Sequence, residues 1–235
     1  MSHIGVLGGM GPAATVDFMA KLVALTPAQR DQDHLPVVVT SLPQIPDRSA
    51  AIMGTGANPL DALLRGIRLL NQSGAGLIVI PCNTSHHWYE EMQAASNAPI
   101  LHIAQACVQK ITPGTRTLLL ATRGALRSGF YQRALDAAGA QWELPGEGPE
   151  QAAVDECIRL VKAGQIKASG NQLAMALRAS AERGTQAVIL GCTELPLALP
   201  HSGTQGLQPL DSTLELARAA VDYALSSNWR WDLSA

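Results

Sequence analysis

Charged residues are scarce in this sequence, and no basic ones gather into a run. Lys and Arg total 17 and Asp and Glu total 19, so that charged residues make up 15% of the 235-residue chain and the formal net charge is −2. Nucleic-acid binding leaves an electrostatic footprint of clustered Lys and Arg, which is missing here. The composition therefore argues against a nucleic-acid partner and favours a compact enzyme of one domain or two small ones.

Long apolar runs are lacking as well. The longest, at residues 77–81 and 118–121, fall far short of the ~20 residues that a membrane-spanning helix needs. Residues 1–3 lead into the first expected strand without a charged or apolar leader and without a cleavage site for export. We therefore expect no membrane association and a cytoplasmic location, where thiols stay reduced.

Cysteine is also sparse, and its spacing is informative. The chain has 4 cysteines with no CxxC or Cys-x-x-His pattern, which argues against a structural zinc site or any other bound metal. Cys107 and Cys157 each share a helical face with apolar residues, so we expect both in the core. Cys82 and Cys192 differ, because each follows an apolar run and precedes hydrogen-bonding residues.

What the sequence does contain is a repeated unit around those two cysteines. Residues 76–84 (GLIVIPCNT) recur in altered form as residues 186–194 (QAVILGCTE). Each copy is a short apolar run that predicts a buried strand of a parallel sheet, with the cysteine at its carboxyl end. Ligands bind at that end of open α/β sheets, so the repeat predicts two half-sites across a shared cleft. One thiol there can remove a proton from one face of a small molecule while the other protonates the opposite face, which inverts a carbon centre.

The rest of the chain alternates between expected strands and helices. Strands are expected at residues 4–7, 37–41, 77–80, 117–121 and 188–190, and helices near 12–25, 59–72, 86–95, 103–111, 126–138, 152–163, 168–183 and 212–226. This alternation predicts an α/β fold of parallel sheets flanked by helices. The repeat favours two pseudo-symmetric lobes. We expect residues 1–100 in the first lobe, completed by a C-terminal helix within 210–235, and residues 101–209 in the second.

The glycine turn at residues 8–12 (GGMGP) has two possible meanings. With the residues that follow, it satisfies the G-x-G-x-x-A fingerprint of dinucleotide-binding proteins. The second expected strand ends in Ser41, however, and not in the acid that binds the ribose, so nicotinamide binding is disfavoured. The free N–H groups of the following helix, with Pro12 suited to its first turn, instead fit a substrate carboxylate.

Four motifs together resemble the cofactor-independent aspartate/glutamate racemase family. They are residues 8–12 (GGMGP), 81–84 (PCNT), 191–195 (GCTEL) and 211–213 (DST). Residues 26–34, 43–48 and 161–164 resemble aspartate racemases in particular, and the similarity extends over nearly the whole chain. The resemblance implies two α/β lobes with the active site between them, a homodimer, and racemisation of an amino-acid substrate without pyridoxal phosphate or another cofactor.

The resemblance also implies roles for individual residues. Cys82 and Cys192 match the two thiols that act as general base and general acid, exchanging roles with the direction of reaction. Asn83, Thr84 and Thr193 match positions that hydrogen-bond the substrate, and the basic Arg48 and Lys162 match positions that bind its carboxylates. The full expected substrate-binding set is Met10, Arg48, Asn83, Thr84, Thr122, Arg123, Gly124, Ala125, Lys162, Thr193 and Glu194.

One segment departs from the family pattern, and it leaves the substrate open. Relatives usually carry Thr-x-Gly-Thr where this chain has Thr122, Arg123, Gly124 and Ala125, so one hydroxyl is lost and one charge is gained. Either the pocket is re-specified or backbone amides bind the substrate. Aspartate is the first expectation, followed by glutamate or a broad range of amino acids. The alternatives are a maleate isomerase or arylmalonate decarboxylase of the same superfamily, and a non-catalytic binding protein for small acids.

Overall fold

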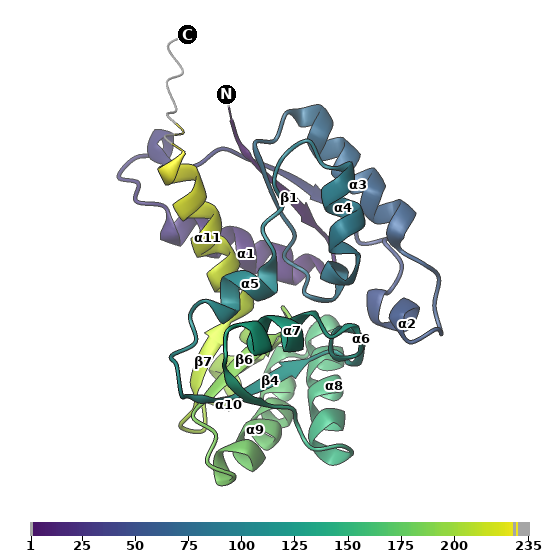
Figure 1. Ribbon diagram of the computed structural model, residues 1–235, viewed down its shortest axis with the longest axis vertical. Coiled ribbons are helices and arrows are strands. Elements are labelled where there is room, and N and C mark those ends of the chain that lie inside the picture. Colours follow the sequence, from purple (N-terminus) through teal and green to yellow (C-terminus); the bar gives the residue numbers. More distant parts are fainter. Residues whose placement is uncertain (1, 228, 230–235) are drawn as a thin grey trace.

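The computed structural model describes residues 2–227 and 229, and these form two α/β lobes, one above the other in Figure 1. The strands are β1 (Ile4–Gly8), β2 (Val37–Ser41), β3 (Leu77–Val79), β4 (Arg116–Ala121), β5 (Gln141–Glu143), β6 (Ala187–Gly191) and β7 (Gln208–Asp211). The α-helices are α1 (Pro12–Leu25), α2 (Arg48–Ile52), α3 (Leu60–Ser73), α4 (Tyr89–Ala95), α5 (Ile103–Val108), α6 (Arg123–Ser128), α7 (Phe130–Ala137), α8 (Pro149–Lys162), α9 (Ile166–Glu182), α10 (Leu195–Ser202) and α11 (Ser212–Ser226). Two 3-10 helices, η1 (Asp31–Asp33) and η2 (Thr84–Trp88), complete the list.

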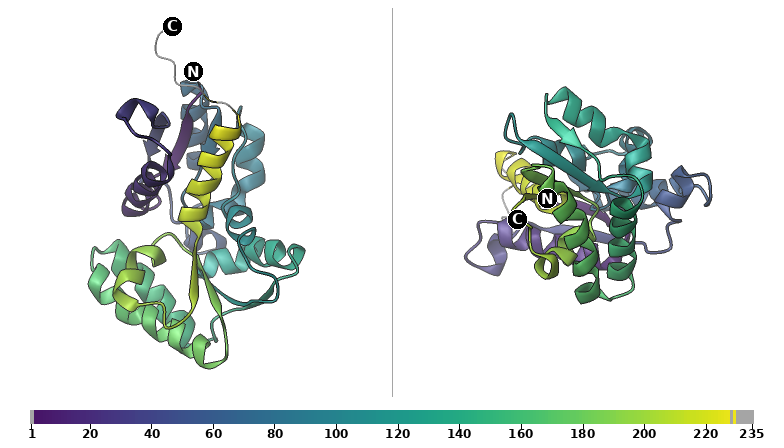
Figure 2. Two further views of the ribbon diagram at one scale, coloured as in Figure 1. Left: turned by 90° about the vertical axis from the view of Figure 1, so that its left-hand side faces the viewer. Right: turned by 90° about the horizontal axis from the view of Figure 1, so that it is seen from below.

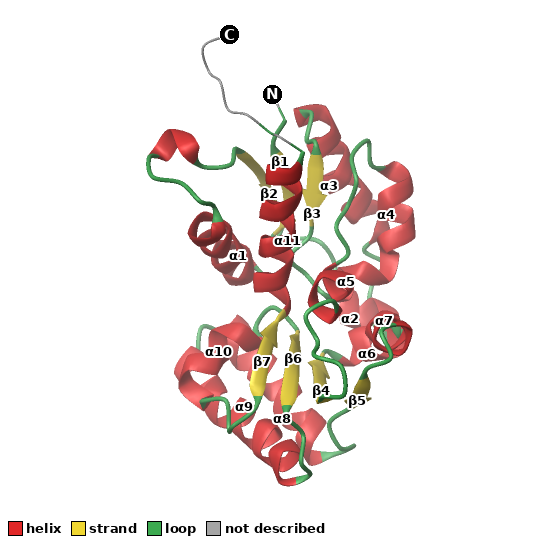
Figure 3. Ribbon diagram, turned by 60° about the vertical axis from the view of Figure 1, so that its left-hand side comes forward, coloured by secondary structure: helices red, strands yellow, loops and turns green. Residues whose placement is uncertain are grey.

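Each lobe is built on one parallel sheet. The upper sheet has the strand order β2-β1-β3 and the lower sheet the order β5-β4-β6-β7, with every pair parallel. Figure 3 shows the four strands of the lower sheet side by side. The strands that carry the cysteine repeat, β3 and β6, occupy corresponding positions, each paired with the first strand of its own sheet. The predicted fold class is therefore confirmed.

Helices cover both faces of each sheet. In the upper lobe, α1 and α11 pack on the face that carries Ile4 and Val6, while α3 and α4 pack on the face that carries Leu7. In the lower lobe, α8, α9 and α10 cover one face, and α6 and α7 cover the other. Cys157 lies in the first of these lower cores and Cys107 in the second, both 0% exposed, which confirms that they are core residues.

The chain crosses between the lobes twice. The first crossing follows α5, and the second joins β7 to α11, which returns to the upper lobe beside α1 and α5, as Figure 2 shows. Asp211 lies at the second crossing and fixes the start of α11 relative to α1. Its carboxylate caps α11 and also pairs with Lys21 of α1 at 2.6 Å. The lobe limits at residues 100 and 210 remain a proposal, and residues 228 and 230–235 of the expected C-terminal segment lie outside the described residues.

Several elements differ from the sequence-based expectation. The helix expected over residues 126–138 is two helices, α6 and α7, separated by Gly129 with a left-handed φ of 71°. Residues 84–88 of the next connection form a 3-10 helix before α4 begins. The strands β5 and β7 and the helices α2 and α10 were not expected. Within the described residues, no helix has both the length and the apolar character to cross a membrane.

The turn after β1 depends on Gly9. This residue has a φ of 91°, and a Cβ atom there would lie 2.3 Å from the backbone nitrogen of Leu42. We predict that Gly9→Ala lowers the free energy of unfolding by at least about 2 kcal/mol more than Gly74→Ala, since both residues have a left-handed φ but only Gly9 faces packed backbone. Urea unfolding of both variants measures the difference, and equal losses would contradict it.

Candidate active site

Two thiols meet in one pocket between the lobes. Cys82 follows β3 and Cys192 follows β6, and their residues are 4% and 5% exposed. The residues that line this pocket come from both lobes: Met10, Asp47, Arg48, Ser49, Cys82, Asn83, Thr84, Thr122, Lys162, Cys192, Thr193 and Glu194. The strand ends thus bring the two cysteines of the repeat to the same small space.

The pocket is nearly closed. Its cavity volume in this conformation is about 20 Å³. A single water needs roughly 10–15 Å³ by this measure, so the pocket holds about one water and no larger molecule. Any small organic substrate therefore enters only when the lobes or their side chains move apart.

Most of the residues expected from the sequence lie in this lining, and three do not. Arg123 points away and pairs with Asp155 at 2.6 Å, with 53% of its side chain exposed. Gly124 and Ala125 are buried in α6, and their N–H groups donate to the hydroxyls of Ser49 and Thr122. The backbone amides proposed for this segment are therefore engaged within the protein.

The Cys192 thiol contacts a carboxylate. Its Sγ donates to Glu194 Oε2 at 3.0 Å, and the Thr193 hydroxyl donates to the same oxygen at 3.2 Å. Burial raises the pKa of Cys192 well above that of an ordinary thiol, and the charge of Glu194 raises it further. In this conformation Cys192 is therefore held as a thiol.

The backbone of Cys82 is fixed by a buried histidine. The Cys82 carbonyl accepts from the Ser85 hydroxyl at 2.7 Å and from His86 Nδ1 at 3.0 Å. His86 Nε2 accepts from the backbone N–H of Ile103 at 3.2 Å, which places the ring proton on Nδ1. Burial lowers the pKa of His86 to about 4, so the ring is neutral. Sequence reasoning did not identify His86, which is the fourth residue after Cys82.

Asn83 joins the two strand ends through side chains. Its Oδ1 accepts from the Tyr131 hydroxyl at 2.6 Å, and its Nδ2 donates to Ser212 Oγ at 3.0 Å. Ser212 in turn donates to the carbonyl of Leu190 on β6 at 2.7 Å. These bonds connect the upper lobe to α7, α11 and β6, and they give Ser212 of the DST motif a structural role.

Arg48 brings a largely buried positive charge to the pocket. Its Nη1 donates to the carbonyls of Ile45 and Pro46, each at 3.0 Å, and its Nη2 donates to the carbonyl of Met10 at 3.4 Å. Its Nε is buried without a partner. A guanidinium has five N–H donors, so the Nε–H and one N–H of Nη2 remain without a bond to the protein.

Lys162, the last residue of α8, supplies a second cation. Burial of its ammonium lowers the pKa of Lys162, but the negative charges around it, Glu194 first and Asp47 among the others, outweigh burial and raise the pKa overall. The residue is exposed along its other side, where it borders a surface hollow with Arg123 and Asp155. Asp47 and Ser49 also line the pocket and were not predicted, although they flank Arg48 in the sequence.

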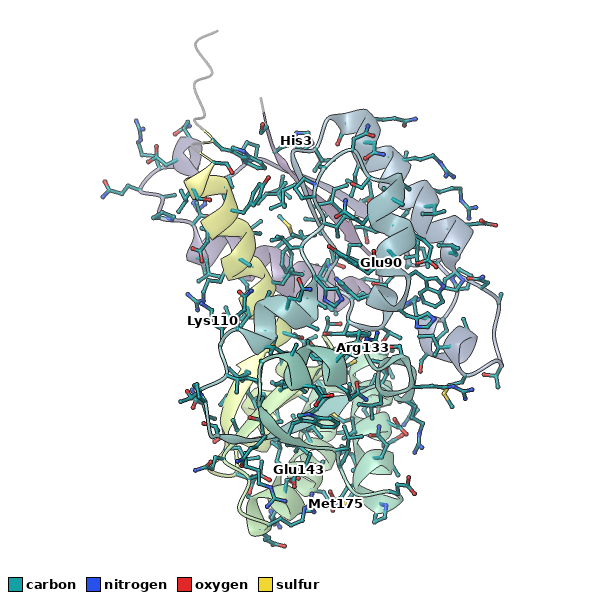
Figure 4. The ribbon with its side chains drawn as sticks, in the orientation of Figure 1. His3, Glu90, Lys110, Arg133, Glu143 and Met175 are labelled. Atoms are coloured by element: carbon teal, nitrogen blue, oxygen red, sulfur yellow. The ribbon has the colours of Figure 1, made fainter. Side chains whose placement is uncertain are left out.

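Two further hydrogen bonds link the lobes at the pocket. Ser49 Oγ accepts from the Gly124 N–H at 2.9 Å, and the hydroxyls of Thr84 and Thr122 lie 2.9 Å apart. A Cβ atom on Gly124 would lie 2.7 Å from Ser49 Cα, so only glycine allows α2 and α6 to approach this closely. A wider groove between α4, α5 and α7, bordered by Glu90 and Arg133 (Figure 4), contains no thiol.

Comparison with known proteins gives one family. The model of the Asp/Glu/Hydantoin racemase family matches residues 7–220. The broad specificity amino-acid racemase RacX of Bacillus subtilis is 29% identical over 95% of this chain and 98% of its own. The structure of Picrophilus torridus aspartate racemase is similar, with a TM-score of 0.85 and 31% identity over 95% of this chain and 94% of that one. Glutamate racemase from Francisella tularensis, at 16% identity and a TM-score of 0.73 over 96% of this chain and 82% of that one, shares the fold.

The buried histidine predicts how stability depends on pH. His86 binds a proton with a pKa near 6.5 in the unfolded state but near 4 in the folded state. The free energy of unfolding therefore falls as the pH drops from about 6.5 to about 4, and His86 causes no further loss below pH 4. One pKa unit is about 1.4 kcal/mol, so His86 accounts for up to roughly 3 kcal/mol. Chemical unfolding of wild type and His86→Asn from pH 7 to 4 measures it. The variant should lose less stability, whereas the exposed control His87→Asn should follow wild type.

Proposed function

The chain belongs to the Asp/Glu/Hydantoin racemase family, and from that premise we propose that it racemises an amino acid with two thiols and without pyridoxal phosphate. The observation that carries this proposal is the approach of Cys82 and Cys192 to one pocket from opposite lobes. A base on one face of Cα and an acid on the other are what inversion requires.

The proposed chemistry is a pair of proton transfers. One cysteine, as a thiolate, takes the α-proton, and the electron pair of the broken C–H bond passes to Cα and is delocalised onto the α-carboxylate. The other cysteine, as a thiol, then donates its proton to the opposite face of Cα. Because the α-hydrogen is weakly acidic, the reaction depends on neutralising the α-carboxylate in a pocket that excludes water. A closed pocket of the size described supports this second condition.

We propose aspartate as the preferred substrate. The Nε–H and the remaining Nη2–H of Arg48 are donors that support carboxylate binding by this guanidinium. Lys162 offers a second positive charge beside the thiols for the other carboxylate. The Picrophilus relative, described as an aspartate racemase, supports the same choice.

A broader amino-acid specificity is the second candidate. It is favoured by the Bacillus relative, which is described as a broad specificity racemase and covers nearly the whole chain. It is also favoured by Ala125, which carries no hydroxyl where relatives usually have Thr. Glutamate falls within this range.

We further propose a homodimer in the cytoplasm. The resemblance to the family supports the dimer, and 4 unpaired cysteines suit a reducing compartment. Light scattering on the purified protein tests the dimer, which a monomer at micromolar concentration would contradict.

The first prediction concerns the two thiols. In deuterated water and without added pyridoxal phosphate, the purified protein should invert an amino acid and leave deuterium at Cα. Cys82→Ala and Cys192→Ala should each abolish nearly all of this exchange-linked inversion, because each removes the acid or base from one face. Chiral chromatography with mass spectrometry measures both products.

The matched controls are the two core thiols. Cys107→Ala and Cys157→Ala should retain turnover and lose roughly 1–2 kcal/mol of stability, the cost of a small buried side chain. Full activity after either pocket substitution would remove the two-thiol mechanism. Conversion of maleate, or saturable binding without turnover, would redirect the assignment to an isomerase of the superfamily or to a binding protein.

The second prediction concerns substrate choice. Arg48→Ala and Lys162→Ala should each lower kcat/KM for aspartate at least roughly tenfold, equivalent to about 1.4 kcal/mol of transition-state stabilisation. The exposed Arg127→Ala, which removes the same charge outside the pocket, should leave it unchanged. Circular dichroism across a panel of L-amino acids decides the matter. The two-cation clamp is wrong if a neutral amino acid outpaces aspartate and Arg48→Ala is unimpaired.

A further inference from the structure

The contact between Cys192 and Glu194 has no counterpart around Cys82. Among the hydrogen bonds of the described residues, the Cys192 thiol donates to a carboxylate that is itself only 4% exposed. Glu194 Oε1, the other oxygen, lies 3.6 Å from where a Cβ on Gly11 would be, close to the first turn of α1. The carboxylate therefore lies near the N-terminal end of that helix, close to the place where the sequence alone suggested a substrate anion.

Electrostatics limits the protonation states of this pair. A thiolate on Cys192 beside an ionised Glu194 would place two negative charges about 3 Å apart in a buried site. Like charges this close in a buried site repel each other strongly, which disfavours the thiolate of Cys192. Since burial and the charge of Glu194 both raise the pKa of Cys192, the proton between the two groups lies on sulfur in this conformation.

The charged groups around the pair come from several elements. Lys162 is a cation whose charge acts on both members of the pair. The other titratable or charged groups that face the pair are Asp47 and Arg48 at the start of α2, Cys82 after β3, Tyr131 on α7 and Cys157 on α8. One proton shared between Cys192 and Glu194 leaves a single negative charge opposite Lys162.

We propose that Glu194 is a positioning residue that stores the proton of Cys192, a role within turnover that rests on the proposed function. In the step we infer, the S–H bond of Cys192 breaks, its electron pair stays on sulfur, and the proton forms an O–H bond with Glu194 Oε2. The products are a thiolate and a carboxylic acid, with no change in total charge. Cys192 becomes the base for one enantiomer in this way, and the reverse transfer restores the thiol.

Activity alone does not isolate this step. The two enantiomers have equal free energies, so kcat/KM must be the same in both directions at every pH. The state of the Cys192 thiol has to be measured directly. Alkylation by iodoacetamide serves, because only the thiolate reacts and each cysteine is quantified on its own peptide by mass spectrometry. Opening of the pocket affects the rate of labelling but not its midpoint in pH.

The experiment uses the full chain with Cys82→Ser, so that Cys192 is the remaining pocket thiol. When the labelling rate of Cys192 is followed against pH, its midpoint pH should lie well above the midpoint pH of an ordinary thiol. Adding Glu194→Gln keeps the shape of the side chain and removes the charge, so the midpoint should fall by at least about one pH unit and labelling at pH 8 should quicken roughly tenfold. Glu182→Gln, the same change at an exposed position, should alter neither.

Glu194→Asp provides a second reading. It retains the charge but withdraws it by one methylene, so the midpoint should fall by less than in Glu194→Gln. This variant decides the question if Glu194→Gln unfolds, which labelling of the buried Cys107 would reveal. A midpoint that stays unchanged or rises in a folded Glu194 variant overturns the proposal. Because the labelling does not depend on turnover, a shifted midpoint in a protein that racemises nothing contradicts the proposed function alone.

Discussion

Two strand ends must face the same small volume from opposite sides, and much of the molecule follows from that requirement. Cys82 and Cys192 stand at the carboxyl ends of β3 and β6, so the two sheets have to point their carboxyl edges toward each other. Parallel strands in turn need helical crossovers on both faces. β3 and β6 are accordingly apolar on both sides and buried along their whole length. The sequence repeat corresponds to this arrangement, because each lobe contains one copy of the strand that ends in a cysteine.

Polar side chains around the pocket are buried, so breaking the hydrogen bond of any one of them costs free energy. Asn83 is bonded by Tyr131 and Ser212, and the Ser212 hydroxyl continues to β6. In a site of low dielectric, a network of this kind stabilises one arrangement of the lobes when complete and penalises the loss of any member. The same environment explains why Cys192 keeps its proton beside Glu194. Burial therefore has two effects: it strengthens the hydrogen bonds that fix the pocket, and it raises the pKa of the Cys192 thiol.

The sequence predicted the central elements well and the peripheral ones poorly. Buried strands such as β3 and β6 are visible because both of their faces are apolar. By contrast, β5 has only three residues, β7 contains Pro209, and α10 contains Pro196 and Pro200, so none carries a clear periodic signal. In the pocket, the cysteines and cations were predicted from motifs. Tyr131, Ser49 and His86 were not, because their roles come from partners distant in sequence or from backbone contacts.

The two crossings of the chain have a mechanical consequence. A body attached at two points turns easily about the line that joins them and resists other displacements. The lobes are joined near residues 110–115 and at Asp211, on the same side of the molecule as α5 and α11, whereas Ser49 and Gly124 meet through α2 and α6. On that side the lobes are held by non-covalent contacts, among them the Ser49–Gly124 bond and the Thr84–Thr122 contact, and nearby Asn83 adds bonds to Tyr131 and Ser212. The covalent connections therefore restrain the two lobes along one side of the molecule, and the relative position of Cys82 and Cys192 depends on non-covalent contacts along the other.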